Sequence, residues 1–394
     1  MAIKYINELP IENKRTFIRV DFNVPIKEGK IKDDTRIRAA LPTIEHAISR
    51  NAKVILASHL GRPSGTGFEE KYSLALVADR LSELLGQRKV IFTEDCIGDA
   101  TKKLSRDLEP GDVMLLENLR FHAEEEKNET NFCQQLASLA DVYINDAFGT
   151  AHRAHASTAG MVKFVEIKGA GFLMKKEVES LSRLINNPER PFVAILGGAK
   201  VSDKIAVIEN LLNLVQTLVI GGGMAFTFLK AKGASIGKSL FEEDKLYVAN
   251  KILDRAATKG INILLPVDHI VANEVSDTAK TMVTGDANVP DGMMGLDIGP
   301  KTVAEFEKTI GSAKTIFWNG PLGVFETAQF SKGTFDIARL VAKTQAMSVV
   351  GGGDSVSAVN KAGVADKIGH ISTGGGASLE LIEGKKLPGL AALE

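Results

Sequence analysis

Cysteine is scarce in this sequence of 394 residues, since only Cys96 and Cys133 occur and neither has a second cysteine or a histidine at ligand spacing. This excludes a disulfide framework and gives no sign of a structural zinc site, which fits a reducing compartment. The opening residues, MAIKYINELPIENKR, also lack the apolar run of a signal peptide. We therefore expect a cytoplasmic protein.

The sequence also has no excess of basic or acidic residues, since it contains 48 Lys and Arg residues and 49 Asp and Glu residues. The resulting net charge of -1 gives no broad attraction to nucleic acid. Only residues 210–229 run for 20 positions without a charge, and their Asn, Gln and Gly residues indicate a buried helix, strand and loop. We expect neither nucleic acid nor a membrane as a partner.

Motifs of several common enzyme classes are missing. No G-x-G-x-x-G occurs, which weakens a nicotinamide dehydrogenase, and the nearest P-loop match, Gly237-Lys238-Ser239, has Lys232 where the first glycine belongs. Neither G-x-S-x-G nor H-E-x-x-H is found, so the serine hydrolase and zinc protease patterns are absent as well.

Strand-like apolar runs alternate with helical patterns along the whole chain. In the first half the runs end in polar residues, and in the second half in glycine or asparagine: TFIRV, KVILAS, VMLLEN and VYINDAF, then FVAIL, TLVI, TIFW, SVV and IST. This alternation is typical of βαβ units. It predicts an α/β fold of two doubly wound parallel-sheet (Rossmann-like) domains, each with a site at its strand ends.

An interdomain helix and hinge is predicted between the two halves. Met174, Val178, Leu181 and Ile185 recur at helical spacing, which predicts a connecting helix over 171–186. The domains we expect are 1–168 and 187–378, with residues 169–186 between them.

The second half holds 28 of the 37 glycines, among them Gly197-Gly198 and the triplets Gly221–Gly223, Gly351–Gly353 and Gly374–Gly376. Such loops between a strand and a helix let backbone amides point at a phosphate, although single triplets also serve as tight turns. Their number favours a nucleotide site.

Charged side chains accompany these glycines. Lys200 and Lys204 are four residues apart, so we expect them on one helical face around a phosphate. Asp354 is a candidate Mg²⁺ ligand or a cap of the helix that starts near Ser355, and Glu326 a candidate for a ribose hydroxyl.

The first half holds 11 of the 15 arginines in residues 1–160. Several predicted strand ends carry basic or polar candidates: Asp21, Asn23, Arg36, Arg38, His59, Arg62, Arg120, His152, Arg153 and His155. Their convergence fits a small, multiply anionic substrate. Taken singly, each arginine could instead form a surface salt bridge, and Asp21 and Asn23 could simply form a turn. We expect Glu124–Glu126 to be a solvated helix start.

Nine strings together closely resemble phosphoglycerate kinase. They are RVDFNVP, DDTRIRAALPTI, SHLGRP, LLENLRF, INDAFGTAHRAH, GGAKVSDKI, GPLGVFE, GGGDS and GGGASLELIEGKKLPGL, which span residues 19 to about 390. The resemblance implies a glycolytic kinase that transfers a phosphoryl group between 1,3-bisphosphoglycerate and ADP with Mg²⁺.

The resemblance also implies roles for residues. Phosphoglycerate would bind to Asp21, Asn23, Arg36, His59, Arg62, Arg120 and Arg153 in the N-terminal domain, to which the tail 379–394 would return. The nucleotide would bind to Lys200, Lys204, Gly221, Gly222, Gly295, Pro321, Glu326, Gly351, Gly352, Gly353, Asp354 and Ser355, with Asp354 on Mg²⁺. Arg36, Lys200 and Gly375 would act on the transferred phosphoryl group.

Three functions remain open from the residues. A kinase of this family needs no general base, because the attacking carboxylate is ionised at neutral pH, and it would work as a hinged monomer. A nicotinamide dehydrogenase of a phosphorylated acid needs the missing fingerprint. A non-catalytic sensor of a phosphorylated ligand would bind without turnover.

Overall fold

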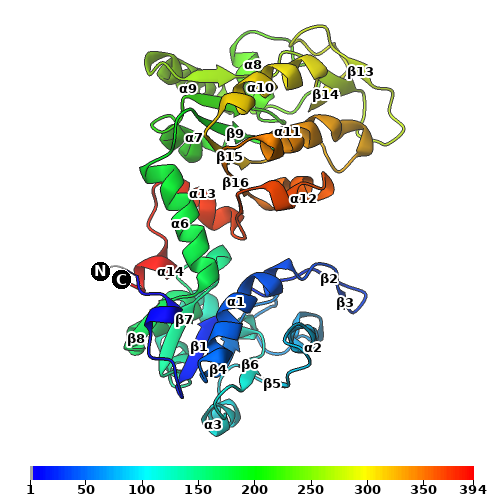
Figure 1. Cartoon of the computed structure of the whole chain (residues 1–394). Coiled ribbons are helices and arrows are strands. Elements are labelled where there is room, and N and C mark those ends of the chain that lie inside the picture. The colour runs from blue at the N-terminus through cyan, green and yellow to red at the C-terminus, as the bar shows by residue number, and fades with distance from the viewer. Residues whose placement is uncertain (1–2) are drawn as a thin grey trace. The chain divides into compact units, whose positions relative to one another are not determined.

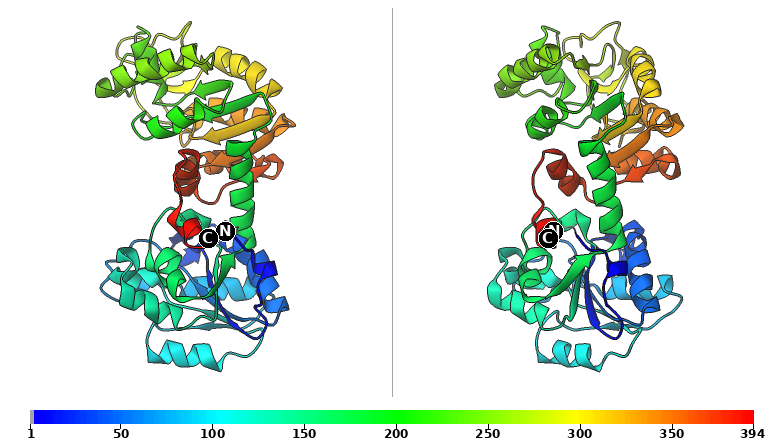
Figure 2. Two further views of the ribbon diagram at one scale, coloured as in Figure 1. Left: turned by 90° about the vertical axis from the view of Figure 1, so that its left-hand side faces the viewer. Right: turned by 60° about the vertical axis from the view of Figure 1, so that its left-hand side comes forward.

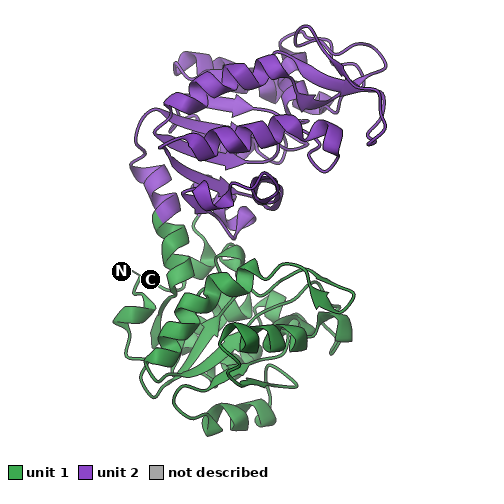
Figure 3. Cartoon of the chain, turned by 45° about the vertical axis from the view of Figure 1, so that its right-hand side comes forward, with its two compact units in different colours: residues 1–179, 386–394 green, residues 180–385 purple. Residues whose placement is uncertain are grey.

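Short runs rich in Val, Ile, Leu and Phe form two six-stranded parallel sheets in the computed structural model, which describes residues 3–394. One sheet lies in each of two units (Figure 3). Unit 1 contains the chain up to Glu179 together with Lys386–Glu394, and unit 2 contains Ser180–Lys385. The chain passes from unit 1 into unit 2 within α6 (Phe172–Asn186), at the helix predicted over 171–186. The predicted boundaries, after residues 168 and 378, lie earlier in the chain than these.

Unit 1 has the strand order β5-β6-β4-β1-β7-β8. The strands are β1 (Arg15–Arg19), β4 (Lys53–Ala57), β5 (Val90–Phe92), β6 (Val113–Leu115), β7 (Val142–Asn145) and β8 (Ile167–Ala170), with a hairpin of β2 (Ile26–Lys27) and β3 (Lys30–Ile31). Because β1 lies inside the sheet and pairs with both β4 and β7, the chain winds to both sides. The four predicted strands are confirmed, while β5 and β8 were not predicted.

Helices cover the sheet of unit 1 (Figure 1). They are α1 (Thr35–Ser49), α2 (Ala75–Leu84), α3 (Asp99–Asp107), α4 (Ala123–Lys127), α5 (Thr130–Ala137) and α14 (Pro388–Ala391). Alternate residues of a strand face opposite sides, so Ile18 packs with α1 and α2, whereas Phe17 stacks on Tyr143 at a centroid distance of 6.1 Å.

Unit 2 repeats the plan with the order β11-β10-β9-β15-β16-β17. The strands are β9 (Phe192–Leu196), β10 (Thr217–Ile220), β11 (Asn262–Leu264), β15 (Thr315–Asn319), β16 (Met347–Gly351) and β17 (His370–Ile371). The helices are α7 (Ile205–Leu211), α8 (Ala225–Ala231), α9 (Leu246–Thr258), α10 (Pro300–Ser312), α11 (Lys332–Lys343), α12 (Gly353–Lys361) and α13 (Gly375–Ile382). The winding reverses between β9 and β15, which creates a crevice at their carboxyl ends.

A small antiparallel sheet in unit 2 was not predicted. It has the order β13-β12-β14, with β12 (His269–Ala272), β13 (Met282–Val283) and β14 (Met294–Ile298). The prediction of two doubly wound α/β sheets is confirmed, and this third sheet adds a wall beside one of them.

The C-terminal segment belongs to unit 1, as the red end of the chain in Figure 2 shows. The backbone N–H of Gly389 donates to Ala151 O at 2.8 Å, and the Asn145 amide donates to Gly389 O at 3.3 Å. Residues 379–385 lie in unit 2, where the Asn210 amide donates to Ile382 O. Within residues 3–394, no helix is long and apolar enough to cross a membrane.

Asp146 follows β7 and holds the first turn of α6. Its Oδ1 accepts from the N–H of Met174 at 3.0 Å, and burial raises the pKa of this carboxyl to about 7. The folded state therefore binds this proton more tightly than the unfolded state, so the group's contribution to stability falls as pH rises from about 4 to about 7.

Replacement of Asp146 by Asn removes this titration while keeping an oxygen for Met174. We expect the melting temperature of Asp146→Asn to decline less than that of the wild type between about pH 4.5 and 7.5. Calorimetric scans of both proteins across this range measure the difference, and parallel pH profiles would contradict the assignment.

Candidate active site

The polar candidates of unit 1 gather at the carboxyl ends of its strands. Asp21 follows β1, His59 follows β4, and Arg36 comes from α1. Arg36 Nη1 donates to Asp21 Oδ2 at 2.8 Å, and His59 Nδ1 lies 3.9 Å from Asp21 Oδ1. That Oδ1 is buried and accepts no hydrogen bond in the described chain, so it is available to accept one from a ligand hydroxyl.

Hydrogen bonds to one glycine draw in two more predicted residues. The Gly61 N–H donates to Asn23 Oδ1 at 2.8 Å, and Arg120 Nη1 donates to Gly61 O at 2.8 Å. Arg62, directly after Gly61, and Arg153 are both exposed. Burial, and then the nearby Arg153, lowers the pKa of Arg120. These contacts bring Asp21, Asn23, Arg36, His59 and Arg120 together at one edge of the sheet. The candidate Arg38 instead pairs with Asp34 at 2.9 Å.

Burial, reinforced by neighbouring positive charges, sets the protonation of the two histidines in this site. Burial, then the nearby Arg19 and Arg120, holds the pKa of His59 well below its usual range. Burial and the nearby arginines lower the pKa of His155 to about 3. Both histidines are therefore neutral at pH 7, and the remaining positive charge favours a bound anion.

Three supporting residues of this site were missed by sequence reasoning: Arg19, Glu125 and Ser157. The interpretation of Glu124–Glu126 as a solvated helix start is wrong for Glu125. α4 does begin there, but Glu125 is fully buried because Ser157, 32 residues later, covers it with two hydrogen bonds. Arg19 could have been noticed as a charge inside an apolar strand.

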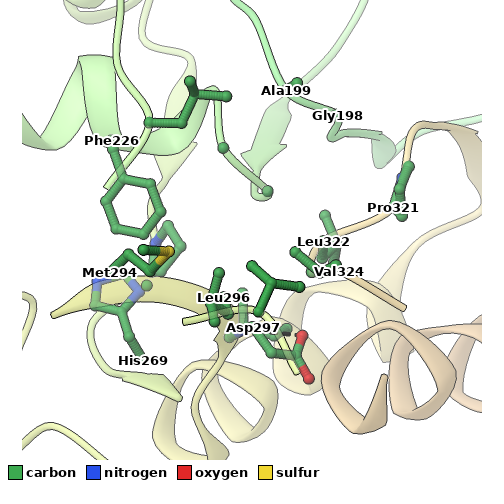
Figure 4. A pocket seen from close by; sticks show the side chains of 18 of the residues that line it. Gly198, Ala199, Phe226, His269, Met294, Leu296, Asp297, Pro321, Leu322 and Val324 are labelled. Carbon is green, nitrogen blue, oxygen red and sulfur yellow. Dashed lines mark hydrogen bonds between the residues drawn. The ribbon is translucent and has the colours of Figure 1, made fainter. Parts of the chain in front are cut away.

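Unit 2 holds a cavity of about 490 Å³ at the carboxyl ends of β9, β10 and β15 (Figure 4). One wall is apolar and includes Phe226 from α8, Leu296 from β14 and Leu322, while Gly198 and Ala199 lie across from it. The predicted residues in its lining are Gly222, Gly295, Pro321, Glu326 and Asp354. A flat apolar group with a polar end fits such a lining.

Two glycines give the cavity its shape. Gly222 has φ +66°, and a Cβ there would lie 2.8 Å from backbone atoms of Gly198 and Pro321. A Cβ at Gly295 would lie 2.2 Å from the ring of Phe226. Gly221 does not line the cavity and packs against Leu322 instead.

Two helix starts meet beside the cavity. α12 begins at Gly353 and α13 at Gly375, and a Cβ at Gly375 would lie 2.8 Å from Gly352 Cα. Ser355 Oγ accepts from the Gly320 N–H at 2.6 Å and so ties this loop to the end of β15. Free N–H groups and the positive ends of two helix dipoles thus collect at one place, as in anion sites.

The two predicted lysines are arranged differently from our expectation. A shared helical face for Lys200 and Lys204 is wrong, because α7 begins only at Ile205. The Glu242 carboxylate accepts hydrogen bonds from the N–H and the hydroxyl of Ser202, at 3.0 and 2.6 Å. These bonds anchor residues 201–204, the turns that come before α7. Lys200 is exposed, whereas Lys204 donates to Asn319 Oδ1 and has a pKa lowered by burial.

Two places offer oxygen, nitrogen or sulfur ligands to a metal. Asp354 is an exposed carboxylate in the cavity lining. Asp95, Cys96 and His122 form the one mixed cluster found within residues 3–394, but His122 Nε2 already pairs with Asp95 at 2.7 Å and burial raises the pKa of the Cys96 thiol.

Comparison with known proteins decides the family. The family model for phosphoglycerate kinase matches residues 6–385. The chain belongs to the phosphoglycerate kinase family. Its relatives in the family include phosphoglycerate kinases of Anaeromyxobacter dehalogenans, 59% identical over 100% of both chains, and of Moorella thermoacetica, 56% identical over 100% of this chain and 99% of the relative.

Solved structures agree with this assignment. The phosphoglycerate kinase of Coxiella burnetii superposes with a TM-score of 0.90 at 46% identity, covering 100% of this chain and 99% of the other. That of Pyrococcus horikoshii reaches 0.85 at 36% identity, covering 99% and 98%. The resemblance inferred from the nine strings is confirmed, and the protein is a phosphotransferase rather than a dehydrogenase or a sensor.

Removal of the Glu242 carboxylate tests how the segment between Lys200 and Lys204 is held. In Glu242→Ala the amides of residues 201–204 lose their anchor, so we expect them to exchange with deuterium about tenfold faster. Mass spectrometry of peptides measures this, with Glu243→Ala as the matched control because Glu243 is exposed. Unchanged protection in Glu242→Ala would contradict the role.

Proposed function

We propose that this chain catalyses reversible phosphoryl transfer between 1,3-bisphosphoglycerate and ADP, giving 3-phosphoglycerate and ATP. The observation that carries the proposal is the pairing of a basic strand-end site in unit 1 with a glycine-lined cavity in unit 2, in a chain of this family. We further propose that it works in the cytoplasm as a monomer.

Unit 1 binds the phosphoglycerate. Arg36, His59, Arg62, Arg120 and Arg153 supply the positive charges and N–H donors that a carboxylate and a phosphate need. Asp21 accepts from the substrate hydroxyl through its unpartnered Oδ1, and Asn23 borders the same end.

Unit 2 binds the nucleotide. Its base and ribose occupy the cavity, bordered by Gly222, Gly295 and Pro321, with Glu326 at the ribose. Lys200, Lys204 and the loop Gly351–Ser355 hold the phosphates, since the starts of α12 and α13 direct free N–H groups to one place.

Mg²⁺ fits this site through Asp354. A single exposed carboxylate beside a polyphosphate suits a hard cation that takes its other ligands from phosphate oxygens and water. When bound, Mg²⁺ neutralises charge on the nucleotide phosphates.

The reaction asks little covalent chemistry of the protein. In the ATP-consuming direction the nucleophile is a carboxylate, ionised well below pH 7, so no general base is required. Arg36, Lys200 and the amide of Gly375 stabilise the negative charge of the phosphoryl group during transfer. This accounts for a site of arginines, lysines and helix starts without a nucleophile and its base.

A coupled assay with 3-phosphoglycerate, ATP and Mg²⁺ tests the function directly. We expect turnover that requires Mg²⁺ and falls at least a hundredfold in Lys200→Ala. Because the Lys200 side chain is exposed, we expect this variant to fold. Binding of both ligands without turnover would contradict the proposal.

Two arginines separate transition-state stabilisation from substrate binding. We expect Arg36→Ala to lower kcat by about a hundredfold with a smaller change in KM, and Arg120→Ala mainly to raise the KM for 3-phosphoglycerate. Steady-state kinetics at saturating ATP separate the two constants. Near-normal kcat in purified Arg36→Ala would refute its assignment.

Transfer needs substrates that are assigned to different units, so we propose a hinge that closes when both are bound. Small-angle scattering should show a smaller radius of gyration with both ligands than with neither. An unchanged radius would exclude the hinge.

A further inference from the structure

Arg19 is a fully buried cation that none of the proposed substrate contacts involves. It lies in β1 with 1% of its surface exposed, and its Nη1 donates to Val20 O. Its Nε donates to Ser157 Oγ at 2.8 Å, and its Nη2 lies 3.2 Å from His59 Nδ1. The guanidinium therefore joins the interior of unit 1 to a residue of the basic site.

Ser157 connects this cation to a buried carboxylate. Its hydroxyl accepts from Arg19 and donates to Glu125 Oε1 at 2.5 Å, while its N–H donates to Glu125 Oε2 at 3.0 Å. Glu125 and Ser157 are both at 0% exposure. A guanidinium and a carboxylate thus share one hydroxyl in the buried interior, where losing either partner leaves the other unpaired.

The contact between Arg19 and His59 fixes the tautomer of the imidazole. A guanidinium has donors only, so Nδ1 must be the acceptor at 3.2 Å. The competing partner of Nδ1, Asp21 Oδ1, lies 3.9 Å away, beyond hydrogen-bond distance. A neutral imidazole with a bare Nδ1 carries its proton on Nε2, which makes no hydrogen bond to another residue in the described part of the chain.

We propose that Glu125 and Ser157 are positioning residues that hold Arg19 so that it keeps His59 as the Nε2–H tautomer. The imidazole then donates to the anionic substrate, whereas the opposite tautomer would turn a lone pair towards it. The consequence for catalysis rests on the proposed function, but the tautomer is a property of the free protein.

The first test measures the tautomer without substrate. Nitrogen-15 NMR of histidine-labelled protein at pH 7 distinguishes protonated from bare ring nitrogens, and His59→Gln identifies the signal among the 7 histidines. We expect a bare Nδ1 and a protonated Nε2 for His59 in the wild type. A proton on Nδ1, or on both nitrogens, would overturn the proposal whatever the enzyme's activity.

The second test breaks the connection at its two ends. In Ser157→Ala and Glu125→Gln we expect the His59 signals to move towards a mixture of tautomers. The KM for 3-phosphoglycerate should rise about tenfold, the kcat and the KM for ATP staying within twofold. Glu124→Gln is the matched control, because Glu124 is the exposed neighbour of Glu125.

The outcomes of these tests separate the positioning role of Glu125 and Ser157 from the proposed function. Unchanged NMR signals and KM in folded Ser157→Ala and Glu125→Gln overturn the positioning role. A joint loss of kcat and of affinity for both substrates shows a general structural defect and overturns it too. If the wild type has the expected tautomer but does not turn over, the proposed function fails while the tautomer assignment stands.

Discussion

Repulsion between like charges is the constraint on which unit 1 depends. Several guanidinium groups meet at one sheet edge, and the protein holds them there without a bound anion by placing carboxylates beneath and beside them. Asp21 pairs with Arg36, Glu126 lies 3.0 Å from Arg120 Nε, and Glu125 balances Arg19 through Ser157. Burial keeps His59 and His155 neutral, so the two histidines add no positive charge to that of the arginines.

Unit 2 meets the same need with backbone groups. Its strand ends approach so closely that a Cβ at Gly222 or Gly375 would meet neighbouring backbone at 2.8 Å, and this approach brings two helix starts together. Free N–H groups attract phosphate without carrying full charges that would have to be balanced in the absence of a ligand. One fold thus supplies two kinds of anion site.

Local features of the sequence predicted much of this arrangement. Short apolar runs located nine of the twelve parallel strands, and the residues directly after them supplied most of the site. The predictions that failed depend on contacts between residues that lie far apart in the sequence. Ser202, in the turns before α7, is bonded to Glu242, and the buried Glu125 is bonded to Ser157. Nothing near these residues in the sequence reveals either contact. β12–β14 are short strands joined with an irregular register, so they leave no clear alternation to detect.

The most direct measurement of the central claim is a crystal structure with 3-phosphoglycerate and ADP both bound. The account predicts the phosphoglycerate at the strand ends of unit 1, with an anionic oxygen at His59 Nε2, and the nucleotide in the cavity beside Phe226. Both ligands in one unit, or phosphoglycerate away from Arg36 and His59, would contradict it.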